Sequence, residues 1–141
     1  MSTIRQPAPG RPSTAVVDEG LRSLAADGGF DVAIRGASME PRLPDGTRLH
    51  LRRPGLLLPG DVVAIRSGER LLVHRILGAA PRKGGWRLLT QGDAAPRPDG
   101  WLDPAGIIGV ADLPCPPILR LKALAGFGLA LVRGIHHRLK R

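Results

Sequence analysis

Aromatic side chains are scarce in this chain, and their scarcity limits the ligands that it can recognise. Of its 141 residues only two are tryptophan and two are phenylalanine, and none is tyrosine. Proteins that bind nucleic acid by stacking its bases need more aromatic surface than this. The formal charge of +9 comes mostly from arginines scattered among Gly, Ala and Pro, a pattern that a coding bias toward arginine also produces. We therefore do not expect a nucleic-acid partner.

Cysteine is nearly absent as well. The single Cys115 excludes an internal disulfide framework and any metal site built from several cysteines. It lies in the rigid stretch 114–117, Pro-Cys-Pro-Pro, where we expect it to fill a small apolar space at the edge of the domain. Nothing in the sequence indicates a metal or another cofactor, and we expect the chain to work without one.

Long hydrophobic runs are the third feature that the sequence lacks. Residues 1–11 are polar and rich in proline, without the apolar stretch of a secretory signal peptide. The apolar run 123–132 has ten small or apolar residues, whereas a membrane-spanning helix needs about 20. The sequence therefore predicts a cytoplasmic protein, either free or peripheral at the membrane.

Aliphatic residues, glycine and proline are abundant by contrast. Hydrophobic residues make up 43% of the sequence, with 19 Gly and 14 Pro, which is typical of a small, loop-rich fold with an aliphatic core. The length fits one domain. We predict a disordered tail over 1–12, a folded domain over 13–113, and a proline-rich break followed by a basic amphipathic segment over 114–141.

The folded domain is expected to begin with one helix and to continue as β-structure. Ser13 or Thr14 caps a helix that runs to about Ala26, and Gly28 and Gly29 end it. Its predicted apolar face comprises Val16, Val17, Leu21, Leu24 and Ala25. Strands are predicted over 30–35, 47–52, 61–66, 71–77, 86–90 and 106–111. The predicted fold is mainly β: a coiled sheet or partly closed β-barrel of about six short strands, with an N-terminal and a C-terminal helix.

Residues 118–141 form a separate basic segment after the proline-rich break. Arg120, Lys122 and Arg133 bracket its apolar run, and no acidic residue follows Asp112. Two interpretations remain open. The segment lies in the interface of an anionic membrane, or it packs as a terminal helix on its own domain.

One serine stands in a turn suited to a nucleophile. The segment 36–41, Gly-Ala-Ser-Met-Glu-Pro, follows a predicted strand, and its small and turn-forming residues leave the Ser38 hydroxyl exposed. A serine hydroxyl needs a neighbouring base at neutral pH. Two of the four histidines fall in the basic C-terminal end, and His50 alternates with leucines, so we expect it to face away from the core. His74 lies inside the most apolar predicted strand, where a histidine is more often structural than catalytic.

Four segments, taken together and in order, resemble the conserved boxes of type I signal peptidases and of the wider superfamily that includes the LexA-type self-cleaving repressors. They are 36–41 (Gly-Ala-Ser-Met-Glu-Pro), 59–63 (Pro-Gly-Asp-Val-Val), 73–76 (Val-His-Arg-Ile) and 91–93 (Gln-Gly-Asp). The resemblance covers roughly residues 30–111 and implies that 13–113 is a signal-peptidase-like catalytic domain. It implies Ser38 as nucleophile and His74 as general base, where bacterial leader peptidases have lysine and the signal peptidases of the endoplasmic reticulum and archaea have histidine.

The resemblance also implies roles for the groups around this pair. In the His-type family an aspartate orients the histidine; the matching position is Asp99, with Asp93 and Asp103 as alternatives. The backbone N–H of Ser38 is the implied oxyanion donor. Supporting positions are expected at Gly36, Met39, Pro41, Arg75 and Asp93.

The sequence thus predicts a serine endopeptidase of signal-peptidase type. The resemblance implies that it binds an extended leader or precursor peptide along a sheet edge and cleaves it after small residues such as alanine. Two alternatives remain: a regulator that cleaves itself, as LexA-type proteins do, and a catalytically silent module that binds peptides or a membrane interface.

Overall fold

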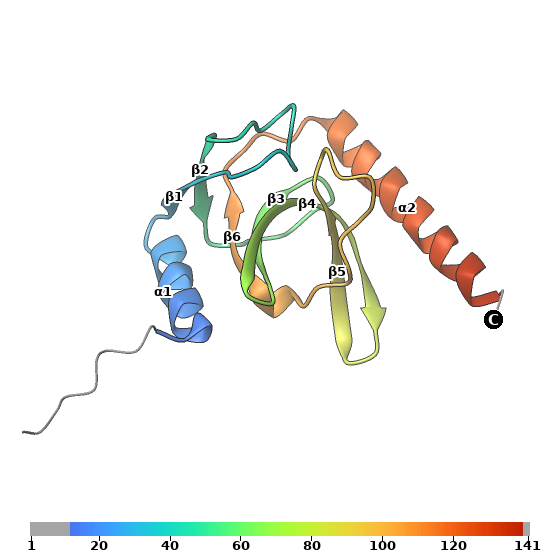
Figure 1. Ribbon diagram of the computed structural model, residues 1–141, viewed down its shortest axis with the longest axis horizontal. Coiled ribbons are helices and arrows are strands. Elements are labelled where there is room, and N and C mark those ends of the chain that lie inside the picture. Colours follow the sequence, from blue (N-terminus) through green and yellow to red (C-terminus); the bar gives the residue numbers. More distant parts are fainter. Residues whose placement is uncertain (1–11, 140–141) are drawn as a thin grey trace, which may run out of the picture.

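The computed structural model describes residues 12–139, so the predicted tail over 1–12 lies outside them except for Pro12. Its centre is one open sheet of six antiparallel strands in the order β1-β2-β6-β3-β4-β5, with helices α1 and α2 on either side (Figure 1). The strands are β1 Phe30–Ala33, β2 Arg48–Arg52, β3 Val62–Ser67, β4 Arg70–Arg82, β5 Gly85–Gln91 and β6 Ile107–Ala111. The prediction of a mainly β fold with a helix at each end is confirmed, and the sheet does not close into a barrel.

Strand β4 extends to Arg82, well beyond the predicted end at Leu77. Its second half forms a hairpin with β5, in which Arg82 lies opposite Gly85. The sequence does not predict this extension, because the segment 78–81, Gly-Ala-Ala-Pro, lacks side chains that favour strands. Glycine is required at Gly78, since a Cβ there would lie 2.7 Å from the ring of Phe127.

Helix α1 spans Thr14–Ala26, as predicted. Ser13 caps it, because its hydroxyl accepts a hydrogen bond from the backbone N–H of Val16. Gly28 and Gly29 follow its end with φ angles of 110° and 92°, in the left-handed region that glycine adopts readily.

The predicted apolar face of α1 is wrong for most of its members. Three of them are exposed: Val16, Val17 and Leu24. The two buried residues of the helix are Ala25 and Asp18. Asp18 is buried because its carboxylate pairs with the Arg66 guanidinium of β3. The hydrogen bonds from Arg66 lower the pKa of Asp18. The Asp18–Arg66 pair therefore docks this side of the helix on the sheet together with Leu21 and Ala25, the two members of the predicted apolar face that pack inward.

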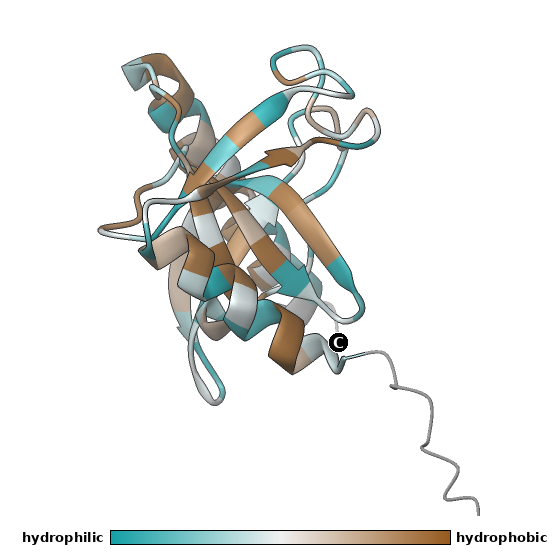
Figure 2. Cartoon of the chain, turned by 90° about the vertical axis from the view of Figure 1, so that its left-hand side faces the viewer, coloured by the Kyte–Doolittle hydropathy of each residue, from teal (hydrophilic) through white to brown (hydrophobic). Residues whose placement is uncertain are grey.

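Aliphatic side chains fill the sheet on both faces, and Figure 2 shows the hydrophobic colouring along the central strands. One cluster comprises Ile34, Met39, Leu43, Leu49, Leu51, Val62, Ala64, Ile108 and Ala111. The other comprises Val63, Ile65, Ile76, Leu88, Ile107 and Val110. Because side chains alternate along a strand, β3 contributes to both clusters and is buried on both faces. The central strands thus hold the surrounding loops on a packed support.

Helix α2 spans Pro117–Leu139 and packs on β4. Leu119 and Ala123 are buried, and Phe127 lies over Gly78. The structure therefore shows a terminal helix packed on its own domain through one face, while the opposite face is exposed. Within residues 12–139, no helix is long and apolar enough to cross a membrane.

The proline-rich break at 114–117 packs Cys115 against the turn that precedes β3. The thiol of Cys115 lies 3.5 Å from the carbonyl oxygen of Gly60, to which it donates a weak hydrogen bond. A Cβ on Gly60 would lie 2.8 Å from that sulfur. Cys115 thus fills a small space between this turn and α2, as expected from the sequence.

Candidate active site

Ser38 lies in the serine loop, residues 34–47, which joins β1 to β2. The loop turns at Gly36, whose φ of 86° lies in the left-handed region and whose N–H donates to Asp45 Oδ1 at 2.7 Å. Met39 is fully buried and anchors the loop in the core, and a cis peptide bond precedes Pro41. The neighbours of the serine therefore set the backbone turn that leaves its side chain partly exposed.

His74 connects Ser38 to Asp99 in a continuous chain of hydrogen bonds. His74 lies in β4 and is 8% exposed; its Nε2 is 3.3 Å from Ser38 Oγ and its Nδ1 is 2.6 Å from Asp99 Oδ2. An ionised carboxylate only accepts hydrogen bonds, so Nδ1 carries the proton and Nε2 is left to accept from the hydroxyl. Catalytic hydrogen bonds are often long in a protein without substrate, and 3.3 Å is within reach of proton transfer after a small approach.

Asp99 is the carboxylate that meets the histidine, among the three that the sequence left open. Asp93 pairs instead with Arg75, and Asp103 caps the short 3₁₀ helix Pro104–Gly106 by accepting from the N–H of Ala105. The structure therefore brings together Ser38, His74 and Asp99.

Thr90, which the sequence analysis missed, holds Asp99 in place. Its hydroxyl donates to Asp99 Oδ2 at 2.7 Å, and its carbonyl accepts from the N–H of Asp99 at 2.8 Å. Thr90 is fully buried in β5, so the bond is shielded from water. A polar residue among the leucines of a predicted strand is the only sequence signal for this role.

Gly92 is a second missed residue, although it belongs to one of the four segments. A Cβ at this position would lie 2.6 Å from the carbonyl oxygen of Ser38 and 3.2 Å from His74 Nε2. The next loop residues also touch the serine, since the N–H of Ala94 donates to the same carbonyl at 2.9 Å. Only glycine allows the loop after β5 to come this close to the Ser–His pair.

Arg75 and Asp93 form an ion pair that stabilises the loop after β5. Two hydrogen bonds of 2.8 Å join the guanidinium to the carboxylate, and Arg75 donates a third, of 2.7 Å, to the carbonyl of Gly60. The hydrogen bond with Asp93 raises the pKa of Arg75. The N–H of Asp93 points at the sulfur of Met39 at 3.5 Å. These contacts tie the loop after β5 to the serine loop.

The backbone N–H of Ser38 is available as a donor. It makes no hydrogen bond to any protein group in the described part of the chain. The N–H of Gly36 is already used by Asp45 and does not supply a second donor. An unused N–H on the nucleophile itself is the arrangement that stabilises an oxyanion in acyl transfer.

An open groove of about 210 Å³ leads to Ser38 and His74. Residues 32–35 line one side, and residues 71–74 of β4 line the other. Strand β1 pairs only with β2, and β4 pairs with β5 only from Arg75 onward. Within the described residues both backbone edges that border the groove are therefore free to bind an extended chain.

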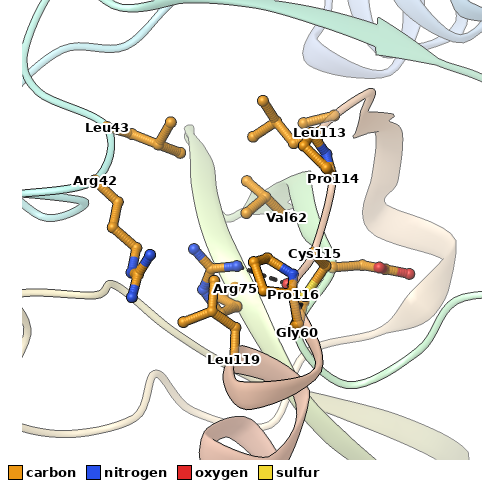
Figure 3. Close-up of a pocket in the computed structure, with 12 residues that line it drawn as sticks. Arg42, Leu43, Gly60, Val62, Arg75, Leu113, Pro114, Cys115, Pro116 and Leu119 are labelled. Carbon is orange, nitrogen blue, oxygen red and sulfur yellow. Dashed lines mark hydrogen bonds between the residues drawn. The ribbon is translucent and has the colours of Figure 1, made fainter.

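Two other hollows lie near the pair without containing it. Figure 3 shows a pocket between the serine loop, which contributes Arg42 and Leu43, and the segment from Leu113 to Leu119. A cavity of about 400 Å³ lies between α2 and the Gly92–Asp93 backbone. Residues 12–139 contain no group of three or more His, Cys, Asp or Glu side chains placed to hold a metal ion.

His50 forms a second, separate pair with Asp31 at 2.7 Å on the exposed side of β1 and β2. Leu49 and Leu51 are buried while His50 is exposed, so the prediction that His50 faces away from the core is confirmed. No serine belongs to this pair.

Comparison of the sequence with protein-family models and with curated proteins finds no match. The resemblance to signal peptidases thus stays a prediction, and the case for a function depends on the geometry of the site.

Proposed function

We propose that this protein is a serine endopeptidase in which Ser38 is the nucleophile, His74 the general base and Asp99 the group that orients the base. The observation that carries the proposal is the hydrogen-bond chain through these three side chains, which come from three separate segments. The three side chains are also held in place, because His74 is buried and the buried Thr90 donates a hydrogen bond to Asp99. A chance contact between surface side chains would lack both features.

The reaction would follow the usual course of acyl transfer. Ser38 Oγ attacks the carbonyl carbon of the scissile peptide bond while its proton moves to His74 Nε2, and the resulting oxyanion accepts from the N–H of Ser38. The imidazolium then protonates the leaving amine, the C–N bond breaks and an acyl-enzyme forms. Water, deprotonated by His74, hydrolyses this ester and restores the serine. Loss of one oxyanion donor typically costs ~3 kcal/mol of transition-state stabilisation.

The groove supports an extended peptide as substrate. The free edges of β1 and of the first half of β4 can each pair with a peptide backbone, which then runs toward Ser38. The groove has a volume of about 210 Å³, which is below the roughly 300–1,000 Å³ of sites for drug-sized ligands. The apolar side chains of Ile34 and Leu71 line it, so small apolar substrate residues fit best. We propose a leader or precursor peptide with residues such as alanine before the scissile bond.

Cleavage of synthetic peptides tests the proposal. The purified protein and Ser38→Ala are incubated with peptides carrying Ala-x-Ala sites, and the products are identified by mass spectrometry. Ser23→Ala, at an exposed serine of α1, is the matched control. We expect cleavage by the wild type and by the control, and none by Ser38→Ala.

The other outcomes favour the two alternatives. A wild-type chain that shortens itself while every added peptide stays intact would favour self-cleavage. Equal recovery of intact peptide from wild type and Ser38→Ala, together with measurable peptide binding, would favour a silent binding module.

We also propose that the enzyme acts in the cytoplasm, at the periphery of the membrane. The net charge of +9 suits the anionic cytoplasmic leaflet, which attracts basic segments. Fractionation of cells that express a tagged chain tests this, because recovery outside the cytoplasm would contradict it.

A further inference from the structure

Helix α2 is apolar on two opposite faces. Its inner face packs on the sheet through Leu119, Ala123 and Phe127. Six further aliphatic side chains are 49–67% exposed: Ile118, Leu121, Leu124, Leu129, Val132 and Ile135. We call these six the outer face. An exposed apolar surface of this extent marks an interaction site rather than ordinary surface.

The spacing of the outer face makes it continuous along the helix. Positions 118, 121, 125, 128, 132 and 135 follow one another at steps of three and four, so they line up on one side. Ala125 and Gly128 are the small members of this line, and Leu124 and Leu129 widen it. At 1.5 Å per residue the line is roughly 25 Å long. The buried Leu119 and Ala123 and the half-buried Phe127 lie on the opposite side of the helix, so most of the outer face points away from the sheet, and Leu129 lies at its margin beside the cavity.

Positive charge borders the outer face. Lys122 and Arg133 are exposed beside it. In the sequence, Arg138, Lys140 and Arg141 come next, and no acidic residue follows Asp112. Clusters of four or more basic residues on an amphipathic helix favour anionic lipid.

Charge also argues against a second copy as the occupant. Two α2 helices packed outer face to outer face would bring their basic residues together without any acidic partner from either helix. Like charges at such a contact oppose association. An anionic bilayer satisfies both features at once, because aliphatic side chains enter the interface while basic side chains reach the headgroups.

We propose that α2 docks the protein on an anionic bilayer by inserting its outer face into the interface. The same helix lines the cavity beside Gly92 and Asp93, through inner-face residues such as Ala123 and through Leu129 at the margin of the outer face. Docking would thus bring the side of the molecule that carries the Gly92 loop, which contacts the Ser–His pair, near the lipid. The docking itself does not depend on the proposed peptidase activity, whereas this placement of substrate cleavage at the membrane does.

Vesicle flotation of the full chain tests the docking. The protein is mixed with vesicles of phosphatidylcholine alone or with about 30% phosphatidylglycerol, at about 0.05 and 0.5 M NaCl. We expect flotation only with the anionic vesicles and less at high salt. Leu121→Glu with Val132→Glu should lower the partition coefficient by about a hundredfold, since each of the two aliphatic side chains withdrawn from the interface is worth about tenfold.

A matched control separates the outer face from general surface effects. Leu56→Glu changes a leucine that is 86% exposed in the loop between β2 and β3, outside α2, and should float like the wild type. Circular dichroism melting checks that all variants fold. Lys122→Gln with Arg133→Gln should weaken binding by a few-fold per charge without abolishing it.

Three outcomes would overturn the inference. They are equal flotation of the Leu121/Val132 variant and the wild type, no flotation with anionic vesicles, and a lipid-free dimer that the same variant abolishes. The last would show that the outer face binds a second copy. Absence of peptide cleavage by the wild type with normal flotation would refute the peptidase and leave the docking intact, so the two proposals fail separately.

Discussion

Two histidine–aspartate pairs in this molecule share a geometry and differ in their surroundings. His50 Nδ1 lies 2.7 Å from Asp31, and His74 Nδ1 lies 2.6 Å from Asp99. The side chains of the first pair are 45% and 55% exposed, and those of the second are 10% and 20% exposed. Distance between the partners therefore does not distinguish them, whereas burial does.

The group that faces the second ring nitrogen separates the pairs chemically. His50 Nε2 lies 2.9 Å from the carbonyl of Gly28, which can only accept, so both ring nitrogens donate and the imidazolium is favoured. The hydrogen bonds with Asp31 and with Gly28 raise the pKa of His50. His74 faces the hydroxyl of Ser38 instead, which can donate a proton. A histidine–aspartate pair becomes a candidate base only where its free nitrogen meets a nucleophile.

The largest expected effect comes from replacing each of the two histidines with alanine. His74→Ala should lower kcat/KM for peptide cleavage by about 10⁴- to 10⁶-fold, since nucleophile and base act as a unit. His50→Ala should stay within about threefold of the wild type, because it lies outside the site and a surface change has small effects. Steady-state kinetics measures both. An active His74→Ala enzyme would contradict the proposed base.

The carboxylates provide the next comparison. Asp99→Asn should lower kcat by about 10⁴-fold, since an amide at this position no longer fixes the tautomer with the proton on Nδ1. Asp31→Asn is the matched control and should leave kcat unchanged. If both variants lose activity equally, the difference between the two pairs does not explain catalysis.

A methyl group added at Gly92, beside His74, should lower the reaction rate less than removal of a catalytic side chain does. In Gly92→Ala the new Cβ would meet the Ser38 carbonyl at 2.6 Å and displace the serine loop or the loop after β5. A misplacement of about 1 Å lowers the rate by roughly 10²-fold. Gly100→Ala, where a Cβ would meet nothing within 4 Å, is the control. Single-turnover rates of the two variants should differ by this factor, and equal rates would refute the steric role of Gly92.

The smallest effect concerns stability and pH at His50. Because the folded-state pKa of His50 is raised above its ordinary value of 6.5, protonation stabilises the fold. This contribution is fully present below about pH 6.5 and is lost as the pH rises through the folded-state pKa. Urea unfolding should show wild type more stable than Asp31→Asn at about pH 5.5, with the gap closing near pH 9. A gap of the same size at both pH values would contradict this account.

Strand positions and the Ser–His pair could be predicted from the sequence, because both depend on local patterns. Alternation located β2 and β3 within one residue, and the four ordered segments identified Ser38 and His74. The buried face of α1 could not be predicted, because the docking of this helix depends on Arg66, which is distant in the sequence. Periodicity cannot show that a buried carboxylate has found a guanidinium.

The finer site residues could not be predicted for the same reason. Asp93, Asp99 and Asp103 are all aspartates of one loop region, and only the fold shows which of them reaches the histidine. Thr90 and Gly92 matter through contacts with Asp99 and Ser38, and the local sequence does not show which groups they contact.

The place of β6 in the sheet has a consequence for biosynthesis. The nucleophile belongs to the β1–β2 unit, and the base and its aspartate belong to β3–β5 and the loop that follows. In the described sheet these two units are joined only through β6, which follows both of them in the sequence and pairs with both β2 and β3. Chains emerge from the ribosome N-terminus first. A nascent chain therefore carries both halves of the proposed peptidase before it carries the strand that joins them, and the proposed site assembles only after β6 has emerged.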